Sequence, residues 1–331
     1  MRFTAAILLL WSTTCLAQFN NFQSLNAPFG ARNAALGGQV VSLADGDLFQ
    51  FVHNPAVLDS VKSTSVGINI SPYFADILSF SGAYQAEFSN IGSLAFGVTY
   101  LDYGDFAETA DNGDELGTFQ SSDLLLTLGK SHHIGAFSLG ANMKYASNGV
   151  AGYGSSLLLF DLGGIYRSTK ADFTAGLVFQ NFGFVLNDFS ASSESQVPFD
   201  VKISTSFKPE YMPFRFSISA YNLTQRDLYY QVASDINKSR TVELADQLLR
   251  RINIGTELIL GDNLQLLLGY SHLRRQELKI GEEGYGAGFS YGFLLGIKQF
   301  QIRYAHATYH AAGGTDFFSI QTNLHSFKKI L

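Results

Sequence analysis

The chain is poor in the residues that stabilise small secreted domains and in those that bind nucleic acids. Among its 331 residues there is one cysteine, Cys15, and 15% of the residues are charged. A single cysteine excludes an intramolecular disulfide framework. The formal net charge of −6 argues against nucleic acid as a partner, because phosphate contacts need clustered Lys and Arg side chains.

The chain also lacks long apolar runs. No stretch after the first 17 residues offers 18 uninterrupted apolar residues, which argues against a transmembrane helix. Residues 1–17 combine Arg2, a short apolar core at 5–11 and a small residue at Ala17, which is the pattern of a secretory signal peptide cleaved after Ala17. The core is too short for a membrane anchor, and a lipoprotein signal that uses Cys15 is the alternative. Cleavage after Ala17 would leave a mature chain without cysteine.

What the chain has instead is glycine, aromatic side chains and regular alternation. It contains 32 glycines, and 14% of its residues are aromatic. In "FSLGANMKY", residues 137–145, apolar side chains occupy one face of an extended strand and small or polar side chains the other. The same period of two recurs at 93–100, 214–220 and 286–297. In a secreted chain this repeated pattern is typical of a transmembrane β-barrel with a lipid-facing outer surface and a polar lumen.

The alternation predicts an all-β fold, a barrel of about fourteen antiparallel transmembrane strands. The predicted strands are 64–70, 76–88, 92–103, 119–130, 135–147, 156–167, 172–182, 199–207, 214–223, 250–260, 263–274, 285–297, 299–309 and 316–324. Short predicted turns, such as 131–133 and 168–171, alternate with longer loops, such as 104–118, 183–198 and 224–249. This alternation and the even strand number are features of outer-membrane barrels. A soluble sandwich or propeller is the alternative, but it gives no reason for the alternation.

A segment rich in small residues precedes the first predicted strand. A fourteen-strand barrel is too wide for its own side chains to fill. We therefore expect residues 18–62 to form a hatch, or plug, in the lumen of a barrel spanning 63–331. Within the hatch, Asn54, Pro55 and Ala56 predict a rigid turn, because Asn favours turn starts and Pro fixes φ. A disordered tail is the alternative, but such tails are poor in aromatics and this segment contains five Phe residues.

Several motifs along the chain resemble one group of outer-membrane proteins. They are "ARNAALGG" (31–38), "NPAVL" (54–58), "LDYGDF" (101–106), "PFRFSI" (213–218), "LRRQELK" (273–279), "GFSYGF" (288–293) and "YHAAGGTDFFSIQTNL" (309–324). In this order they resemble the PorV/PorQ group of the bacterial type IX secretion system, which belongs with the FadL-like fatty-acid transporters. The resemblance implies a fourteen-strand outer-membrane barrel whose N-terminal hatch contains the "NPA" element, Asn54 to Ala56.

The resemblance also implies a function that the residues alone do not show. It would place the chain in the outer membrane of a Gram-negative bacterium, as a non-enzymatic component that anchors the surface attachment complex. The implied partners are a PorZ-like surface protein, the PorU sortase and PorV, together with outer-membrane lipid and the lipopolysaccharide to which cargo is joined. The chain departs from many such barrels in ending on "KKIL" after Phe327 instead of on an aromatic residue.

We find no motif for catalysis, for a cofactor or for a metal ion. His306 and His310 are four residues apart, but on a strand they would lie about 13 Å apart, at ~3.3 Å per residue, and could not share an ion. His132 and His133 fall in a predicted turn. The acidic stretch 105–115 lacks the spacing and closing Glu of a calcium loop, so we expect a solvated loop, with a looser divalent site as the alternative. No catalytic residue, cofactor or metal ligand is therefore predicted.

The segment 241–250, "TVELADQLLR", predicts a helix in the longest loop. Its apolar stripe contains Leu244, Leu248 and Leu249, and this stripe either packs on the barrel rim, docks a partner or covers a ligand pocket. Two functions follow: a scaffold for a secretion-system partner, or a FadL-like outer-membrane channel for hydrophobic small molecules. A channel predicts a continuous apolar pocket from the loops to the hatch, whereas a scaffold predicts a sealed lumen. The small and polar residues expected to face the lumen favour sealing.

Overall fold

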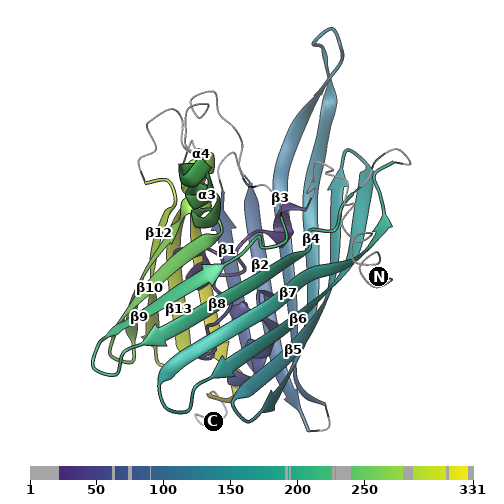
Figure 1. The fold of residues 1–331 in the computed structure, drawn as a ribbon. Coiled ribbons are helices and arrows are strands. Elements are labelled where there is room, and N and C mark those ends of the chain that lie inside the picture. The colour runs from purple at the N-terminus through teal and green to yellow at the C-terminus, as the bar shows by residue number, and fades with distance from the viewer. Residues whose placement is uncertain are drawn as a thin grey trace, which may run out of the picture.

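A computed structural model shows a closed β-barrel with helical segments inside it and at one rim (Figure 1). The structure describes residues 22–61, 64–73, 77–89, 91–190, 193, 195–225, 228, 240–278, 286–310 and 313–326. The expected signal peptide, residues 1–17, and the terminal "KKIL" lie outside the described residues.

Within the described residues, fourteen antiparallel strands close the wall in sequence order, and β1 pairs with β14. The predicted fold class and strand number are confirmed. The strands are β1 Ser65–Pro72, β2 Leu78–Phe88, β3 Gly92–Thr109, β4 Glu115–Ile134, β5 Phe137–Val150, β6 Tyr153–Arg167, β7 Asp172–Asn187, β8 Asp200–Lys208, β9 Phe214–Ala220, β10 Ile252–Leu260, β11 Leu264–Ser271, β12 Phe289–Ile297, β13 Phe300–His310 and β14 Gly313–Asn323.

The alternation of side chains sorts each strand into an outer and an inner face. On β5, Phe137 and Leu139 are 55% and 54% exposed on the outer face, whereas Asn142 and Lys144 are buried on the inner face. The predicted assignment of this strand is therefore correct. Large apolar side chains outside and small or polar side chains inside recur on the other strands, as a lipid-facing wall around a polar lumen requires.

Several strands are longer than predicted, β3 and β4 most of all. The segment 104–118 was expected to be a loop, but β3 and β4 run through most of it and turn only at 110–114. In Figure 1 they form a two-stranded ribbon that projects beyond the rim. A bulge between Asp102 and Asp105 bends the ribbon, and Gly104 has a left-handed φ of 79° there. The prediction failed because above the apolar belt both faces of a strand meet water, so the alternation that marks a strand disappears.

The other end of β4 corrects a second prediction. His132 and His133 were expected in a turn, but β4 continues to Ile134, and the turn lies at 135–136, where Gly135 has a left-handed φ of 62°. A third correction concerns the loop between β11 and β12. Residues 272–274 were expected to continue a strand, but α4, His272–Leu278, begins at that point.

The helical segments lie in two places. Inside the barrel are η1 Gln23–Leu25, α2 Ala31–Ala35, η2 Leu48–Val52 and η3 Pro55–Ser60. At the rim are α3 Arg240–Leu249, whose position agrees with the predicted helix, and α4 (Figure 1). A short turn, η5 Leu324–Ser326, follows β14. Among the described residues, no helix is both long and apolar enough to cross a membrane.

Candidate functional site

The candidate site is the lumen together with the segment 22–61 that occupies it, which we call the hatch. Its segments contact opposite sides of the wall: α2 packs against β11 to β14, and η3 packs against β3 to β6. Nearly all described hatch side chains are buried. These contacts show that the hatch spans the lumen instead of lining one side.

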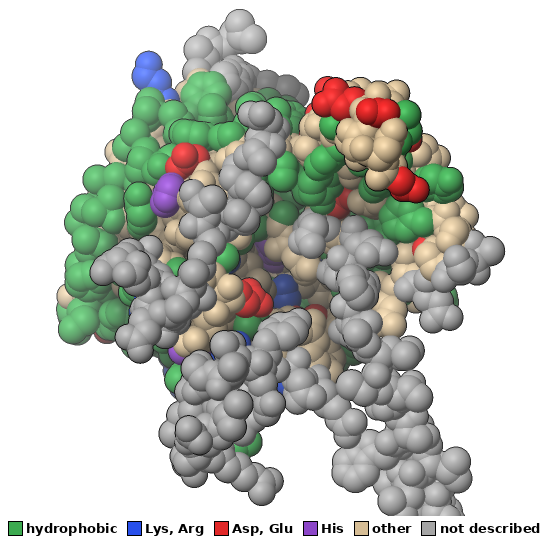
Figure 2. Space-filling view, turned by 90° about the horizontal axis from the view of Figure 1, so that it is seen from above, with side chains coloured by type: hydrophobic (Ala, Val, Ile, Leu, Met, Phe, Trp, Pro, Cys, Tyr) green, Lys and Arg blue, Asp and Glu red, His purple; other side chains and the backbone are tan. Residues whose placement is uncertain are grey.

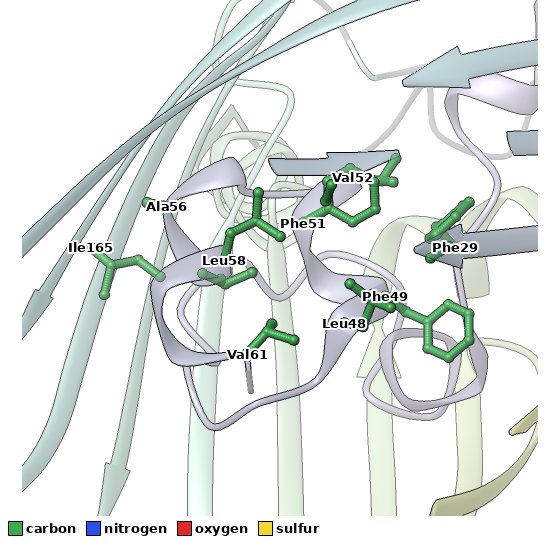
Figure 3. Close-up of a cluster of buried hydrophobic side chains, with 12 residues drawn as sticks. Phe29, Leu48, Phe49, Phe51, Val52, Ala56, Leu58, Val61 and Ile165 are labelled. Atoms are coloured by element: carbon green, nitrogen blue, oxygen red, sulfur yellow. The ribbon is translucent and has the colours of Figure 1, made fainter. Parts of the chain in front are cut away.

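Aromatic rings form the centre of the hatch. Phe29 lies between Phe49 and Phe51, with ring centroids 5.8 and 6.0 Å apart, and Figure 3 shows these rings with aliphatic side chains of η2 and η3. Glycines on the inner wall make room for them. A Cβ at Gly97 would lie 2.8 Å from the Phe51 ring, and one at Gly67 would lie 2.6 Å from the Phe49 ring. The wall and the hatch are thus complementary in shape.

The "NPA" element, which the sequence singled out, lies at the start of η3 against the wall. Asn54 is fully buried; its Oδ1 accepts a hydrogen bond from the Ala56 N–H at 3.0 Å, and its Nδ2 donates one to the Val41 carbonyl at 2.7 Å. Pro55 occupies the first turn of η3, where its missing N–H is not needed. The backbone at Pro55 approaches β5 so closely that only a glycine, Gly140, fits opposite it. The role of this element in holding the hatch remains a prediction.

A buried charge network joins the hatch to β9 and β10. Arg32 donates two hydrogen bonds of 2.7 Å to the carboxylate of Asp45, within the hatch, and bonds of 2.9 and 2.7 Å to Glu257 of β10. Arg215 of β9 donates to Asp45 at 2.7 Å and to Glu257 at 3.1 Å. Two guanidinium groups therefore face two carboxylates, and the four charges balance. We call these four residues the latch.

The latch keeps its hatch groups ionised despite burial. Burial alone would lower the pKa of the Arg32 guanidinium, but the carboxylates of Asp45 and Glu257 outweigh it and raise that pKa above its usual value. Burial alone would raise the pKa of the Asp45 carboxyl, but Arg32 and Arg215 hold it well below its usual range. Arg32 and Asp45 therefore stay charged at neutral pH.

A second polar contact involves the imidazole of His53. Its Nε2 accepts a hydrogen bond from the Phe29 N–H at 3.1 Å, which requires the neutral ring. Burial, followed by the charges of Lys202 and Lys144, lowers the pKa of His53 to about 3. Lys144 itself is paired with Asp161 at 2.7 Å. The docked hatch thus holds the imidazole of His53 in its neutral form over the whole neutral pH range.

The opposite end of the hatch has its own ion pair. Asp59 of η3 pairs with Arg167 of β6 and with the ring of His133 at 3.0 Å, and Ser138 donates to the same carboxylate at 2.6 Å. His133 therefore contacts the hatch from the end of β4, although its side chain is 52% exposed. Ion pairs fasten the hatch at two separated points of the wall.

The predicted docking stripe on α3 points away from the barrel. Leu244, Leu248 and Leu249 are 53%, 65% and 48% exposed. The polar side of the helix faces inward, where Asp246 Oδ1 lies 2.8 Å from His272 Nε2 of α4 and Asp246 Oδ2 accepts a bond of 2.7 Å from Arg250. Burial alone would raise the pKa of Asp246, but these two partners outweigh it and lower it. This exposure disagrees with the alternative in which the stripe packs on the barrel's own rim, and partner docking stays a prediction.

The remaining candidates give no metal site. Among the described residues, no group of three or more His, Cys, Asp or Glu side chains could hold an ion, which includes the acidic stretch 105–115. In Figure 2 its carboxylates gather at the tip of the ribbon. His306 faces outward and pairs with Asp316, while the side chain of His310 lies outside the described residues.

Sequence reasoning singled out residues 18–62 as a hatch but did not propose the latch. The available signal was charge on the inner face of predicted strands: Arg215 and Glu257 alternate with outward apolar residues in a chain with few charges. A charge that faces a lumen needs a partner, and the hatch contains Arg32 and Asp45. The sequence therefore allowed these four residues to be proposed as a charged group, but it did not show which of them pair with each other.

The comparisons with known proteins agree on the fold. No protein-family profile matches the chain, and no curated protein matches its sequence. Among solved structures, the deltaS2 mutant of the TodX monoaromatic hydrocarbon channel is similar over 88% of this chain and 96% of its own, with 12% identity and a TM-score of 0.56. A FadL homologue from Pseudomonas aeruginosa is similar over 90% of this chain and all of its own, with 10% identity and a TM-score of 0.51. At these identities the likeness concerns architecture, and the chain has the architecture of a FadL-like barrel.

Proposed function

We propose that the protein is an outer-membrane barrel of a Gram-negative bacterium that acts as a gated channel for hydrophobic small molecules. The observation that carries this proposal is its architecture, a closed fourteen-strand barrel similar over 88% of its length to a protein described as a monoaromatic hydrocarbon channel. The apolar outer wall supports the membrane location, because so many exposed Phe, Leu and Ile side chains would be unfavourable in water. We assign it no catalytic role.

In this proposal the hatch is the gate. It spans the lumen between opposite parts of the wall, so we expect a solute to pass when part of the hatch moves. The contacts that hold it are hydrogen bonds and ion pairs, which can break reversibly. The latch connects α2, through Arg32, to the wall strands β9 and β10. Loss of this contact should therefore open a path beside α2.

The test is uptake by whole cells, because the lipopolysaccharide leaflet is the barrier that such a channel would bypass. The full chain is expressed in a Gram-negative strain that lacks its own hydrocarbon channels, and entry of labelled toluene and of a long-chain fatty acid is measured. We expect uptake above the empty-vector level for at least one probe and faster uptake in Glu257→Gln. Uptake at the empty-vector level in both strains, with the barrel present in the outer membrane, would rule out the channel.

A second candidate is the scaffold that the sequence motifs suggest, a PorQ-like component of a type IX secretion system. It would anchor a PorZ-like surface protein beside the PorU sortase and PorV, near lipopolysaccharide. The observation that favours it is the outward stripe of α3, because an amphipathic helix held by its polar side leaves three leucines exposed at the rim. An apolar patch of this kind, once covered by a partner, is where binding energy concentrates in an interface.

The scaffold is tested by replacing Leu244, Leu248 and Leu249 together with Ser. We expect the barrel to remain inserted and heat-modifiable on gels, while the surface partner is released into the medium. The matched control is Leu116→Ser at the ribbon tip, because Leu116 is 65% exposed, the same as Leu248. Partner retention in the triple variant would place docking elsewhere, and failure to insert would show that the stripe serves the barrel itself.

A further inference from the structure

The outer face of β12, β13 and β14 carries a carboxylate on a wall dominated by large apolar side chains. Asp316 Oδ1 accepts a hydrogen bond from the Tyr304 hydroxyl at 2.8 Å and lies 2.9 Å from His306 Nδ1. The side chains of Asp316 and His306 are 40% and 30% exposed, so they face outward and not into the lumen. The ring of Tyr291 covers His306 at a centroid distance of 5.2 Å. We call these four residues the outer cluster.

The outer cluster is held in place by the wall beneath it. The imidazole of His306 lies so close over Gly314 that a Cβ at that position would collide with Nε2. Tyr304 is fixed between Phe293 and Phe318, with ring centroids 5.6 and 5.2 Å apart. Among the described residues both hydrogen bonds of the carboxylate go to Oδ1 of Asp316, which leaves Oδ2 as an acceptor.

An apolar groove adjoins the outer cluster on the same face. Its volume is about 310 Å³, at the small end of the roughly 300–1,000 Å³ range of ligand pockets. Its outward side chains are Phe293, Ile302, Tyr304, Phe318 and Ile320. Tyr304 belongs to both features, since its ring lines the groove and its hydroxyl bonds Asp316.

The two features are arranged one above the other along the strands. On β13 the chain runs from the short turn at 298–299 toward the rim, so Ile302 in the groove lies nearer the turn and His306 nearer the rim. The register confirms this order, because Tyr304 pairs with Phe318 and His306 pairs with Asp316. A molecule that occupies both features therefore has an apolar part toward the turns and a polar part toward the rim.

We propose that this face of the wall is a binding site for one membrane lipid, whose acyl chain lies in the groove and whose headgroup donates a hydrogen bond to Asp316 Oδ2. The inference rests on the proposed membrane location of the barrel. In an apolar medium a carboxylate oxygen without a donor is unfavourable, so a headgroup O–H or N–H is stabilised there. A phosphate is disfavoured as the contacting group because it carries the same charge as Asp316.

A lipid fits these observations better than a protein occupant. The groove lies on the lipid-facing side of the strands. Its apolar part lies toward the turns and the polar outer cluster toward the rim, which is the order of the two parts of a lipid aligned along the barrel wall. Two lipids that differ only in hydrogen-bond donors therefore test it. Phosphatidylethanolamine carries an ammonium with three N–H donors, whereas phosphatidylcholine of the same acyl composition carries a quaternary nitrogen with none.

The experiment measures lipid retained by the purified full chain in detergent, by native mass spectrometry, after equal additions of the two lipids. We expect wild-type protein to retain phosphatidylethanolamine preferentially and Asp316→Asn to lose this preference, by roughly three- to tenfold for one charge-assisted hydrogen bond in a membrane. Ile302→Trp fills the groove and should reduce retention of both lipids. Ile203→Trp is the matched control on the outer face of β8, where Ile203 is 46% exposed.

Each contrary outcome overturns a stated part of the proposal. An unchanged preference in Asp316→Asn would remove the carboxylate as the recognition group, and unchanged retention in Ile302→Trp would remove the groove. Cross-linking of a second copy or another barrel through position 302 in native membranes would make this face a protein interface. A heat-modifiable barrel that inserts into vesicles yet shows no preference refutes the lipid site alone, whereas a chain that fails to insert refutes the proposed membrane function.

Discussion

The latch gives the sharpest test of how the hatch is held. The substitution Glu257→Gln keeps the size and shape of a fully buried side chain and removes one charge from a set of four, of which Asp45 is 30% exposed. Arg32 and Arg215 would then share the single carboxylate of Asp45, apart from a more distant contact of 3.9 Å between Arg32 and Asp47. The network would carry an uncompensated positive charge only when the hatch is docked, because water solvates the same groups when it is released.

The size of the effect follows from the cost of breaking a buried pair. Removing one partner of such a pair costs about 3–5 kcal/mol. We use the lower value of about 3 kcal/mol, because Gln still accepts a hydrogen bond and Asp47 supplies a further carboxylate. Since about 1.4 kcal/mol corresponds to a factor of ten, the population of molecules with a released hatch should rise about a hundredfold.

The measurement is thiol labelling of a cysteine introduced at Ala34. This residue is fully buried on α2, the helix that carries Arg32, and the sequence contains no cysteine other than Cys15. Labelling of Ala34→Cys by a maleimide should therefore report release of α2, and its rate should rise about a hundredfold in Glu257→Gln if release precedes labelling. The control is Glu108→Gln on the exposed ribbon. A rate within threefold of wild type, in a barrel that remains heat-modifiable, would refute the latch.

Three further predictions concern the same docked state. Lowering the pH from 7 to 5 should favour release by about 2 kcal/mol, because a free imidazole has a pKa of about 6.5, whereas burial and two nearby lysines lower the pKa of His53 to about 3 when the hatch is docked. The stabilisation of the docked hatch by neutral His53 is thus complete above pH 6.5 and declines as the pH falls toward 3. His53→Gln should remove this part of the pH dependence of the labelling rate, once that rate is divided by the rate of a free thiol at the same pH. Gly97→Val should destabilise docking by about 1–3 kcal/mol, because its side chain would overlap a hatch ring, and an unchanged labelling rate would contradict this packing. Replacing Asn54 and Pro55 together should raise conductance in planar bilayers, and unchanged conductance with the hatch still in place would argue against their role.

The wall could be predicted from the sequence because the membrane imposes a period of two. Alternation on β5 and β12 places large apolar side chains such as Leu139 and Phe289 outward, as expected, with the buried Leu294 of β12 as an exception. The same physics explains the errors. Beyond the apolar belt β3 and β4 are wetted on both faces, so their upper parts, with Asp105 and Glu108, look like a loop in the sequence.

The rim shows a different limit of sequence reasoning. The stripe on α3 has the same periodicity whether it packs inward or faces outward, so the sequence cannot give its direction. That direction is set by Asp246, whose partner His272 lies on a helix that the sequence did not reveal. The latch has the same limit, because Arg32 and Glu257 are 225 residues apart and only the register of the closed barrel brings them together.

Glycines on the inner face of the wall lie where the hatch contacts it. A Cβ at Gly140 would lie 2.6 Å from the backbone nitrogen of Ala56, and one at Gly269 would lie 2.5 Å from the backbone of the two residues that follow α2. Glycine weakens a strand, so a strand retains it on the inner face where something approaches closely. It follows that inward glycines such as Gly129 and Gly255, which alternation alone identifies, mark the contact area of the hatch. Gly129→Leu should therefore disturb docking of the hatch and raise the labelling rate at Ala34→Cys. The control is Gly82→Leu, because a Cβ at Gly82 would meet only wall side chains at 3.5 Å or more. This variant should leave the labelling rate unchanged. Equal effects of the two substitutions would show that the glycines serve the strands and not the hatch.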